Sequence, residues 1–318
     1  HFGYNDVRAN SNQRLVAELT VNQGDFAYQV PGFEGGFGLD GGEHFWSIPS
    51  GGGDVDAALQ ADLTALASGQ YDYDLDLGLL QFNGELFTGS TSNFTGTFLH
   101  VNTVNCAFGS GWGLAGVQEL VENTDGSILL IDGDGSEMLF TAPETPGDVY
   151  GQPAGDFSTL ERLADGTFQR TLTDQTIYRF DANNHLVSVT DRNGNETQHV
   201  YDDAGQLSKI IDPVGLETSF AYTDGRVTSI TDPAGRVTQL AYDADGNLTQ
   251  ITDPDGTQRT WEYDADHHMT AEIDKRGFRE ETFYDFAGRA DYSVRKDGSR
   301  IDINPTQVRG LYRPEETT

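Results

Sequence analysis

The sequence has a single cysteine, Cys106, among 318 residues, and this excludes an internal disulfide framework. It has no run of 18 or more apolar residues, so we expect no membrane span. Basic residues are also scarce, because 19 Lys and Arg stand against 51 Asp and Glu, a net charge of −32. Such a surface repels nucleic acid and anionic lipid, so we expect no nucleic-acid partner. The acidic balance suits high salt, divalent cations or a secreted protein.

Apolar residues make up 36% of the chain and 38 glycines accompany them, so the chain can bury a sizeable core. The sequence begins at His1, with neither an initiator methionine nor a signal peptide. We interpret it as a mature product or a piece of a longer chain. We expect a secreted or cell-surface (extracellular) location.

The C-terminal part of the sequence is a repeat. The letters YDAD occur at Tyr242 and again at Tyr263, and alignment on this aromatic position gives units separated by 21, 21, 20, 21 and 21 residues. Asp follows the aromatic residue in every unit except one, where Thr223 replaces it. The units start at Phe180, Tyr201, Tyr222, Tyr242, Tyr263 and Tyr284.

Each unit contains two turn signatures. One is a glycine or its substitute shortly after the aromatic residue, and the other is Asp-Pro-x-Gly or a variant of it. In Asp-Pro-x-Gly the Asp caps the backbone, Pro presets φ and Gly accepts a positive φ. The segments between the turns are rich in Thr, Val, Ile and Tyr, which indicates short antiparallel strands. We expect such turns at Asp212–Gly215, Asp232–Gly235 and Asp253–Gly256.

The strand before each aromatic residue alternates between two faces. Thr218 and Phe220 share the parity of Tyr222, whereas Glu217 and Ala221 have the other parity. The sequence predicts a largely buried ladder of tyrosine rings that stack unit upon unit, and stability that comes from neighbouring units. The expected structural anchors are Tyr201, Tyr222, Tyr242, Tyr263, Tyr284 and Trp112.

The pattern YDxxGxLxxIxDPxG resembles the YD-repeat, or RHS-repeat, family, which includes bacterial Rhs proteins, the shell of insecticidal toxin-complex C components, and teneurins. The resemblance covers residues 180–303 closely. It implies a continuous antiparallel β-sheet ribbon that spirals into a hollow shell. Some Rhs proteins cleave themselves at an aspartyl site near the end of the shell, and that motif is absent from this sequence.

The stretch Phe98–Phe140 resembles the segment that opens the shell in many such proteins, with F-G-x-G-W at Phe108–Trp112. Its glycines permit a sharp bend, and we expect Trp112 to plug the inside of the shell. The strands Ile128–Ile131 and Glu137–Phe140 flank a Gly-Asp-Gly turn and predict a hairpin.

Residues 1–102 lack the repeat and indicate an N-terminal, sandwich-like β domain, with strands such as YDYDLDLGLLQF. Asp54 is expected to cap a short helix that ends at Gly69. Residues 103–179 then form the shell-opening segment with degenerate repeats, and residues 180–318 form the YD repeats. The predicted fold class is all-β, an antiparallel ribbon that spirals into a partial shell and is preceded by this small domain.

We expect no cofactor, with calcium as the one ion that the acidic turns favour. The carboxylate row Asp72, Asp74 and Asp76 lies on one side of a strand, Asp134 lies in the Gly-Asp-Gly turn, and Asp132 directly precedes that turn. A solvated face and ordinary turn chemistry explain the same residues equally well. His267 and His268 have no Cys or His partner at metal-ligand spacing, and His267 occupies the position of a turn glycine.

The sequence contains no nucleophile elbow, HExxH, P-loop or Cys/His dyad, so we expect no enzyme. It predicts a non-catalytic extracellular structural or adhesive β-repeat protein within a larger or self-associating surface assembly. The expected partners are other copies, further repeats of a longer chain, carbohydrate or a cell-surface partner. One alternative is a fragment of an Rhs-type toxin-encapsulating shell. The other is a carbohydrate-binding module or carbohydrate-active enzyme on a β scaffold, for which His44, Phe45 and Trp46 offer a stacking surface.

Overall fold

The structure is a computed structural model, and every element that it describes is a β-strand. None of the described residues forms a helix that is long and apolar enough to cross a membrane. The chain divides into two compact units, one with residues 1–100 and 284–291 and the other with residues 101–283 and 292–302. The structure describes residues 2–7, 13–23, 26–28, 44–47, 53–57, 61, 63–82, 87–89, 91–145, 147, 149–285 and 288–303.

The first unit contains a six-stranded sheet with the order β3-β2-β6-β7, in which β4 also pairs with β2 and β8 with β6. A separate two-stranded sheet pairs β1 with β5. The apolar residues Val21, Leu66 and Tyr71 are buried together against the six-stranded sheet. The strands are β1 (Phe2–Val7), β2 (Gln13–Gln23), β3 (Phe26–Tyr28), β4 (His44–Ser47), β5 (Gly53–Ala57), β6 (Gly69–Phe82), β7 (Phe87–Thr88) and β8 (Thr91–His100).

The helix expected after Asp54 is wrong, because Gly53–Ala57 is strand β5. Its backbone pairs with β1 in an antiparallel register that places Tyr4 opposite Val55. A pairing between segments about fifty residues apart therefore overrides the local capping signal of one aspartate. The face-to-face packing of a sandwich stays a prediction.

The second unit begins with a three-stranded sheet of order β11-β10-β9. The predicted hairpin is confirmed, since Ile128 pairs with Phe140 and Ile131 with Glu137 across the Gly-Asp-Gly turn. Leu120, Ile128 and Phe140 from this sheet share one buried core with Leu160 and Phe168 of the sheet that follows. The strands are β9 (Gln118–Glu122), β10 (Ile128–Asp132) and β11 (Glu137–Phe140).

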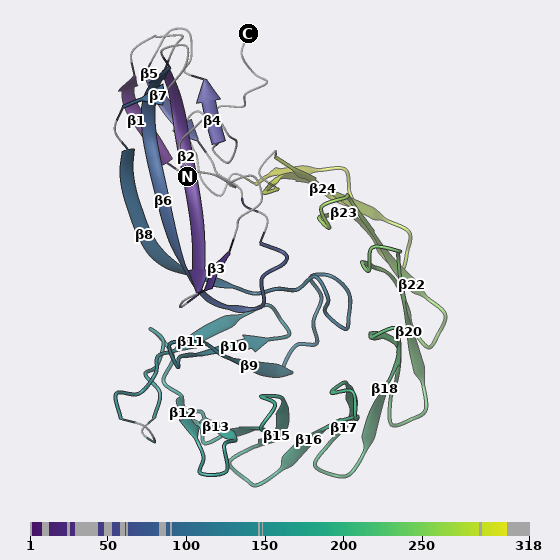
Figure 1. The fold of residues 1–318 in the computed structure, drawn as a ribbon. Helices are drawn as coiled ribbons and strands as arrows, with labels where there is room; N and C mark the ends of the chain where they lie inside the picture. Colours follow the sequence, from purple (N-terminus) through teal and green to yellow (C-terminus); the bar gives the residue numbers. More distant parts are fainter. Residues whose placement is uncertain are drawn as a thin grey trace. The chain divides into compact units, whose positions relative to one another are not determined.

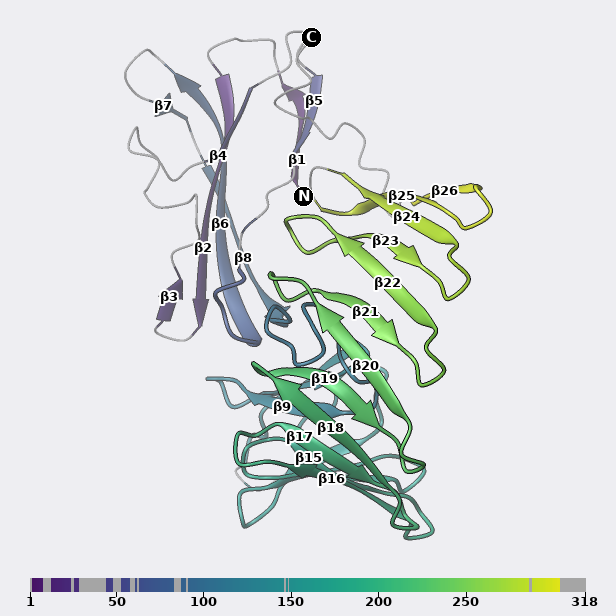
Figure 2. The same ribbon diagram turned by 90° about the vertical axis from the view of Figure 1, so that its right-hand side faces the viewer.

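A fifteen-stranded antiparallel sheet follows, in which every strand pairs with its neighbours in the sequence. Its strands run one beside the next around an arc (Figure 1), and their alternating directions are seen in Figure 2. The predicted all-β fold with an antiparallel ribbon is confirmed. The strands are β12 (Thr159–Arg162), β13 (Phe168–Thr171), β14 (Ile177–Phe180), β15 (Leu186–Thr190), β16 (Glu196–Tyr201), β17 (Leu207–Ile211), β18 (Glu217–Thr223), β19 (Arg226–Thr231), β20 (Val237–Tyr242), β21 (Leu248–Thr252), β22 (Gln258–Tyr263), β23 (Met269–Ile273), β24 (Arg279–Tyr284), β25 (Ala290–Val294) and β26 (Arg300–Asp302).

The three Asp-Pro-x-Gly turns lie where they were expected. In each, the glycine N–H donates to the carbonyl of the first Asp, as Gly215 does to Asp212 at 2.9 Å.

The repeat step of 20 residues, between Tyr222 and Tyr242, arises because the hairpin after Tyr222 is one residue shorter than the others. Its tip is Asp224-Gly225, both at positive φ, and Thr223 pairs with Arg226. This is the geometry of a two-residue hairpin loop.

A β-bulge recurs beside five of the anchor residues. Between Val200 and Tyr201 the register jumps from Lys209 to Leu207, so Ser208 is the extra residue on the partner strand. The same shift occurs at Phe180, Tyr222, Tyr242 and Tyr263. A bulge bends its strand and increases the local twist, so its recurrence every unit accounts for the steady curl of the ribbon.

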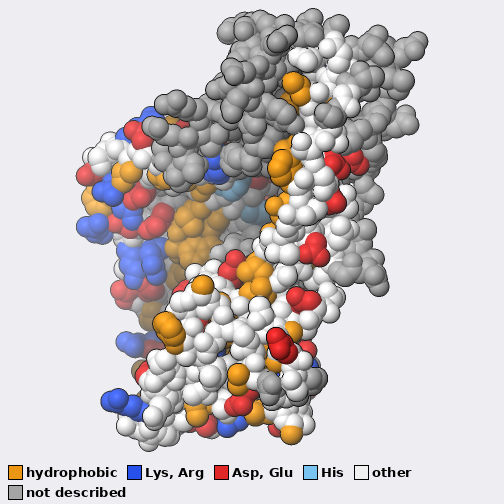
Figure 3. Space-filling model, turned by 90° about the vertical axis from the view of Figure 1, so that its left-hand side faces the viewer, with side chains coloured by type: hydrophobic (Ala, Val, Ile, Leu, Met, Phe, Trp, Pro, Cys, Tyr) orange, Lys and Arg blue, Asp and Glu red, His pale blue; other side chains and the backbone are white. Residues whose placement is uncertain are grey.

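Charge on the surface is distributed. Figure 3 shows Asp and Glu side chains scattered over the visible face, with Lys and Arg side chains mainly on its left-hand part. On this face the net negative charge therefore belongs to many turns and strands rather than to one concentrated patch.

Candidate functional site: the tyrosine ladder and the cavity at Glu119

The tyrosine ladder, defined here as Tyr201, Tyr222, Tyr242 and Tyr263, ties each unit to the one before it. Each hydroxyl donates to a backbone carbonyl fifteen residues earlier, at 2.7 to 3.0 Å. The acceptors are the carbonyl groups of Leu186, Leu207, Val227 and Leu248. The phenol hydroxyl groups therefore donate their hydrogen bonds within the sheet.

The ladder rings are largely covered, although none of them is fully buried. The residue paired opposite the tyrosine is buried at Leu207, Val227 and Leu248, whereas Met269, opposite Tyr263, is half-buried. Partial burial still raises the pKa of Tyr222 and of Tyr242 to about 12, because the phenolate loses hydration. Tyr284 is also half-buried, and it lies in the stretch 284–291 that groups with the first unit.

The bulged residues carry a hydroxyl that the sequence analysis did not single out. Ser208 Oγ donates to the Val200 carbonyl at 2.9 Å, and Thr228 and Thr249 make the equivalent bonds to Ala221 and Ala241. Each hydroxyl thus binds the carbonyl of the residue that precedes the anchor. A Ser or Thr directly after the buried Leu or Val was the signal available in the sequence.

The repeat aspartates are turn caps. In Asp202 one carboxylate oxygen accepts the backbone N–H groups of Ala204 and Gln206, each at 2.9 Å. The pKa of Asp191 falls to about 2, mainly because Asn195 donates to it from both its side chain and its backbone. The same double acceptance occurs at Asp181, Asp191, Asp212, Asp232, Asp243, Asp264 and Asp274.

The glycine-rich segment before β9 lies within the arc of the ribbon (Figure 1). Trp112 Nε1 donates to the Tyr263 hydroxyl at 2.8 Å, and the Trp112 ring packs edge-on against Trp261 at 5.0 Å. Ser110 N donates to the Gly246 carbonyl at 3.1 Å, and Val227 N to the Ala107 carbonyl at 2.8 Å. This segment therefore fills part of the inner face with its backbone as well as its tryptophan.

A cavity of about 430 Å³ opens beside this segment. Glu119 and His185 face it from two elements that meet in an antiparallel bridge, and the Leu120 N–H donates to the Asn184 carbonyl at 3.1 Å. The His185 ring stacks on Tyr201 at 4.6 Å. The apolar part of the lining consists of Val101, Ala107, Phe108, Trp112, Leu114, Val117, Ile131 and Tyr201.

The titratable groups of the cavity are perturbed. Surrounding protein raises the pKa of the Glu119 carboxyl, and nearby His185 opposes that rise. Burial and then the Glu119 charge raise the pKa of the Cys106 thiol. A protonated thiol is a poor nucleophile, so the arrangement disfavours cysteine catalysis although Cys106 and His185 line one cavity.

The predicted acidic residues lie in two places. Asp132 and Asp134 line the cavity, but the Asp132 carboxylate already accepts bonds from Gly116 N at 2.8 Å and from Gln118 Nε2 at 3.0 Å. Asp134 accepts the Ser136 N–H at 2.8 Å. Both carboxylates hold the loops together.

The row Asp72, Asp74 and Asp76 lies in the first unit on β6, the strand between β2 and β8. Asp72 is exposed, whereas Asp74 and Asp76 are half-buried and share the Asn93 amide at 2.5 and 3.2 Å. His44, Phe45 and Trp46 form part of β4, and their side chains lie outside the described residues.

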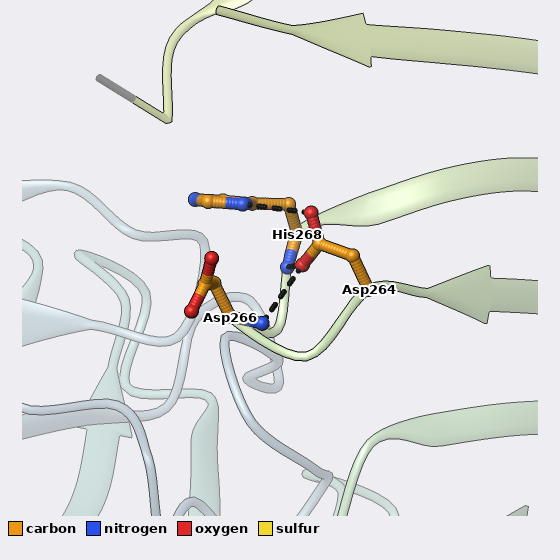
Figure 4. A group of neighbouring side chains, drawn as sticks. All are labelled: Asp264, Asp266 and His268. Atoms are coloured by element: carbon orange, nitrogen blue, oxygen red, sulfur yellow. Dashed lines mark hydrogen bonds and ion pairs between the residues drawn. The ribbon is translucent and has the colours of Figure 1, made fainter. Parts of the chain in front are cut away.

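One group of side chains among the described residues has the composition of a cation site, namely Asp264, Asp266 and His268 (Figure 4). Asp264 caps the turn by accepting the N–H groups of Asp266 and His268, and its second oxygen faces His268 Nδ1 at 3.1 Å. Turn formation explains this cluster. His267 has a φ of 65°, as expected of a residue in the position of a turn glycine.

Known proteins match the repeat region. The family model described as RHS Repeat matches four overlapping stretches, at 180–217, 201–237, 222–258 and 242–279. These stretches are RHS repeats. Each stretch begins at one of the aromatic anchors, namely Phe180, Tyr201, Tyr222 or Tyr242.

Curated relatives match about a third of the chain. The tRNA3(Ser)-specific nuclease WapA of Bacillus spizizenii is 30% identical over 112 residues, which is 35% of this chain and 5% of that protein. The tRNA nuclease WapA of Bacillus subtilis is 29% identical over the same length. The matched part is thus a small fraction of these long proteins.

Solved structures with a similar course of the chain include the Photorhabdus luminescens Tc holotoxin pore with a mutated TccC3, at 13% identity and a TM-score of 0.33. That match covers 70% of this chain and 14% of the other. The TcdB2-TccC3-TEV structure matches at 9% identity with a TM-score of 0.29, covering 73% of this chain and 19% of the other.

Proposed function

We propose that this chain is a non-catalytic wall segment built from RHS repeats, and that it belongs to a larger secreted or cell-surface protein. The observation that carries the proposal is the use of the repeated polar groups. Each ladder hydroxyl binds a backbone carbonyl, and most turn aspartates, such as Asp202 and Asp232, bind backbone N–H groups, so these recurrent side chains serve the sheet itself. A catalytic or ligand-binding repeat would instead present them to solvent.

The names of the relatives define a direct test. WapA proteins are named as tRNA nucleases, and this chain matches a small fraction of their length. The purified chain incubated with total tRNA and magnesium is expected to leave the tRNA intact. Cleavage that co-purifies with the folded chain through two chromatographic steps would contradict the proposal.

Location needs its own experiment. Intact cells of the source organism are treated with a protease, and released peptides are identified by mass spectrometry. Peptides from residues 180–279 in the released fraction support a surface position. Their recovery only after lysis, with an intact periplasmic or cytosolic marker as the control, would contradict it.

A second candidate is the wall of a closed shell around a cargo segment. The recurrent bulge favours it, because each added unit bends the ribbon in the same sense. In the full natural protein, sequences that follow the repeats should then resist protease while the folded repeats are intact. Equal cleavage in folded and in urea-unfolded protein would argue against enclosure.

A further inference from the structure

The cavity beside Glu119 has the features of a binding site. Its volume of about 430 Å³ falls in the range of small-molecule sites, which span about 300–1,000 Å³. It lies wholly within the second unit, between the glycine-rich segment, the β9–β10 sheet and the turn that leads to β15.

Of the three carboxylates that line the cavity, Glu119 is the one that accepts no hydrogen bond from the described residues. No hydrogen bond or ion pair joins its side chain to another of the described residues, whereas Asp132 and Asp134 are both bonded. Its side chain remains accessible to solvent although protein surrounds much of it. A carboxylate in such a position gains free energy when a cation binds to it.

The remaining lining complements the hydrophobic part of a ligand. Phe108, Trp112 and Tyr201 present aromatic rings, and Leu114 and Val117 add aliphatic surface. The lining contains no Lys or Arg, and Gln118 Oε1 is a buried acceptor that has no donor among the described residues. Aromatic faces also attract organic cations directly.

We propose that this cavity binds an organic cation, namely an ammonium or guanidinium group on an apolar chain, with Glu119 as its counter-ion. The aromatic wall covers the apolar chain while the carboxylate accepts the charged N–H groups. The ligand is either a free amine or a Lys or Arg side chain of a partner polypeptide. The proposal is independent of the wall function proposed above.

Isothermal titration calorimetry with a matched pair of probes tests the site. The probes are 2-phenylethylamine and its neutral counterpart 2-phenylethanol, titrated into the whole chain at moderate salt. We expect the amine to bind with a dissociation constant between about 10 μM and 1 mM, and the alcohol to bind at least about tenfold more weakly.

Because the chain carries a net charge of −32, the amine is attracted to it without any specific site. Glu119→Gln and Glu137→Gln remove the same charge, and Glu137 is exposed on β11 outside the cavity. Glu119→Gln should weaken amine binding about tenfold or more, and Glu137→Gln less than about twofold. Near-ultraviolet circular dichroism verifies that both variants are folded.

Equal losses in the two variants would overturn the proposal, and so would equal affinities for the amine and the alcohol. The absence of amine binding at 10 mM probe would also overturn it, because that concentration is about ten times the weakest expected dissociation constant. A peptide with blocked termini and a single lysine distinguishes the two sources. Binding at least about tenfold tighter than the amine indicates a partner side chain, and weaker binding indicates a free amine. In Glu119→Gln, the binding of the amine and the binding of the peptide must both be lost.

Discussion

At Tyr242 a single side chain connects two units in two ways. Its ring packs in the core that contains Val227, Leu248 and Trp261, and its hydroxyl binds the Val227 carbonyl at 2.7 Å. Because the hydroxyl bond is repeated down the ladder, each unit depends on its predecessor for one polar and one apolar contact. Repeat proteins derive their stability from such nearest-neighbour terms.

Tyr242→Phe separates the two contacts, because it keeps the ring and removes the hydroxyl. We expect it to lower the free energy of unfolding by about 1 kcal/mol, since the Val227 carbonyl loses its donor. The measurement is urea denaturation followed by circular dichroism. Tyr178→Phe is the control, because Tyr178 is also half-buried and its hydroxyl makes no hydrogen bond within the described residues. An equal loss in both variants would mean that the ladder bond contributes nothing.

Glu119 makes stability depend on pH with a definite sign. Its folded-state pKa is raised, chiefly because surrounding protein displaces part of the water around this accessible carboxyl, so the folded protein disfavours the charged form. The contribution of Glu119 to the free energy of unfolding is therefore fully present below the unfolded-state pKa. It is lost as the pH rises through the folded-state pKa. The free energy of unfolding of Glu119→Gln, taken relative to that of the wild type, should therefore increase from pH 4 to pH 7. Denaturant titrations at both pH values measure this, and an unchanged difference between the two proteins would refute it.

At the scale of elements, the turns and bulges determine how the ribbon is built. Glycine occupies the left-handed position of most turns, but Gln175 and His267 adopt it with φ of 72° and 65°. A residue with a Cβ is strained there by about 1–2 kcal/mol, and only specific contacts offset that strain. The two positions differ in those contacts, since His267 Nδ1 lies 2.6 Å from Asn247 Oδ1 and Gln175 is exposed.

Gln175→Gly should therefore stabilise the chain by about 1 kcal/mol, because relief of the strain exceeds the entropy cost of glycine. His267→Gly should gain less or nothing, since it also removes the bond to Asn247. Thermal unfolding of both variants under identical conditions tests this. The opposite order of stabilities would show that strain at these turns does not decide their stability.

At the scale of the whole molecule, the net charge of −32 opposes the approach of a second copy. Salt shortens the reach of that repulsion, from about 10 Å at 0.1 M to about 3 Å at 1 M. Self-association, one of the assemblies that the sequence predicts, should therefore increase with ionic strength. Static light scattering from 0.05 to 1 M sodium chloride measures it.

Calcium chloride at equal ionic strength is the matched comparison. Equal association in the two salts indicates screening alone, and greater association in calcium indicates specific calcium binding. A monomer under every condition would contradict the self-association proposal and leave the wall segment to act through further repeats of a longer chain.

The strands and turns of residues 180–303 could be predicted from the sequence, because their determinants are local. Alternating parity sets the face of each side chain, and an Asp followed by a Gly at the turn sets the loop. The same reasoning failed at Asp54, where pairing of β5 with β1 prevailed over a helix-capping signal. It also missed the bulge hydroxyls, which become meaningful only when the register is known.

The sequence by itself determined the repeat, its period, its turns and the all-β fold, because each of these depends on residues within about one unit of each other. Tertiary structure alone decided the contact of Trp112 with Tyr263, which are 151 residues apart. It likewise decided the cavity in which Glu119 faces His185. Burial, a missing hydrogen-bond donor and a raised pKa are properties of a side chain's surroundings, and chain closure over many residues brings those surroundings together.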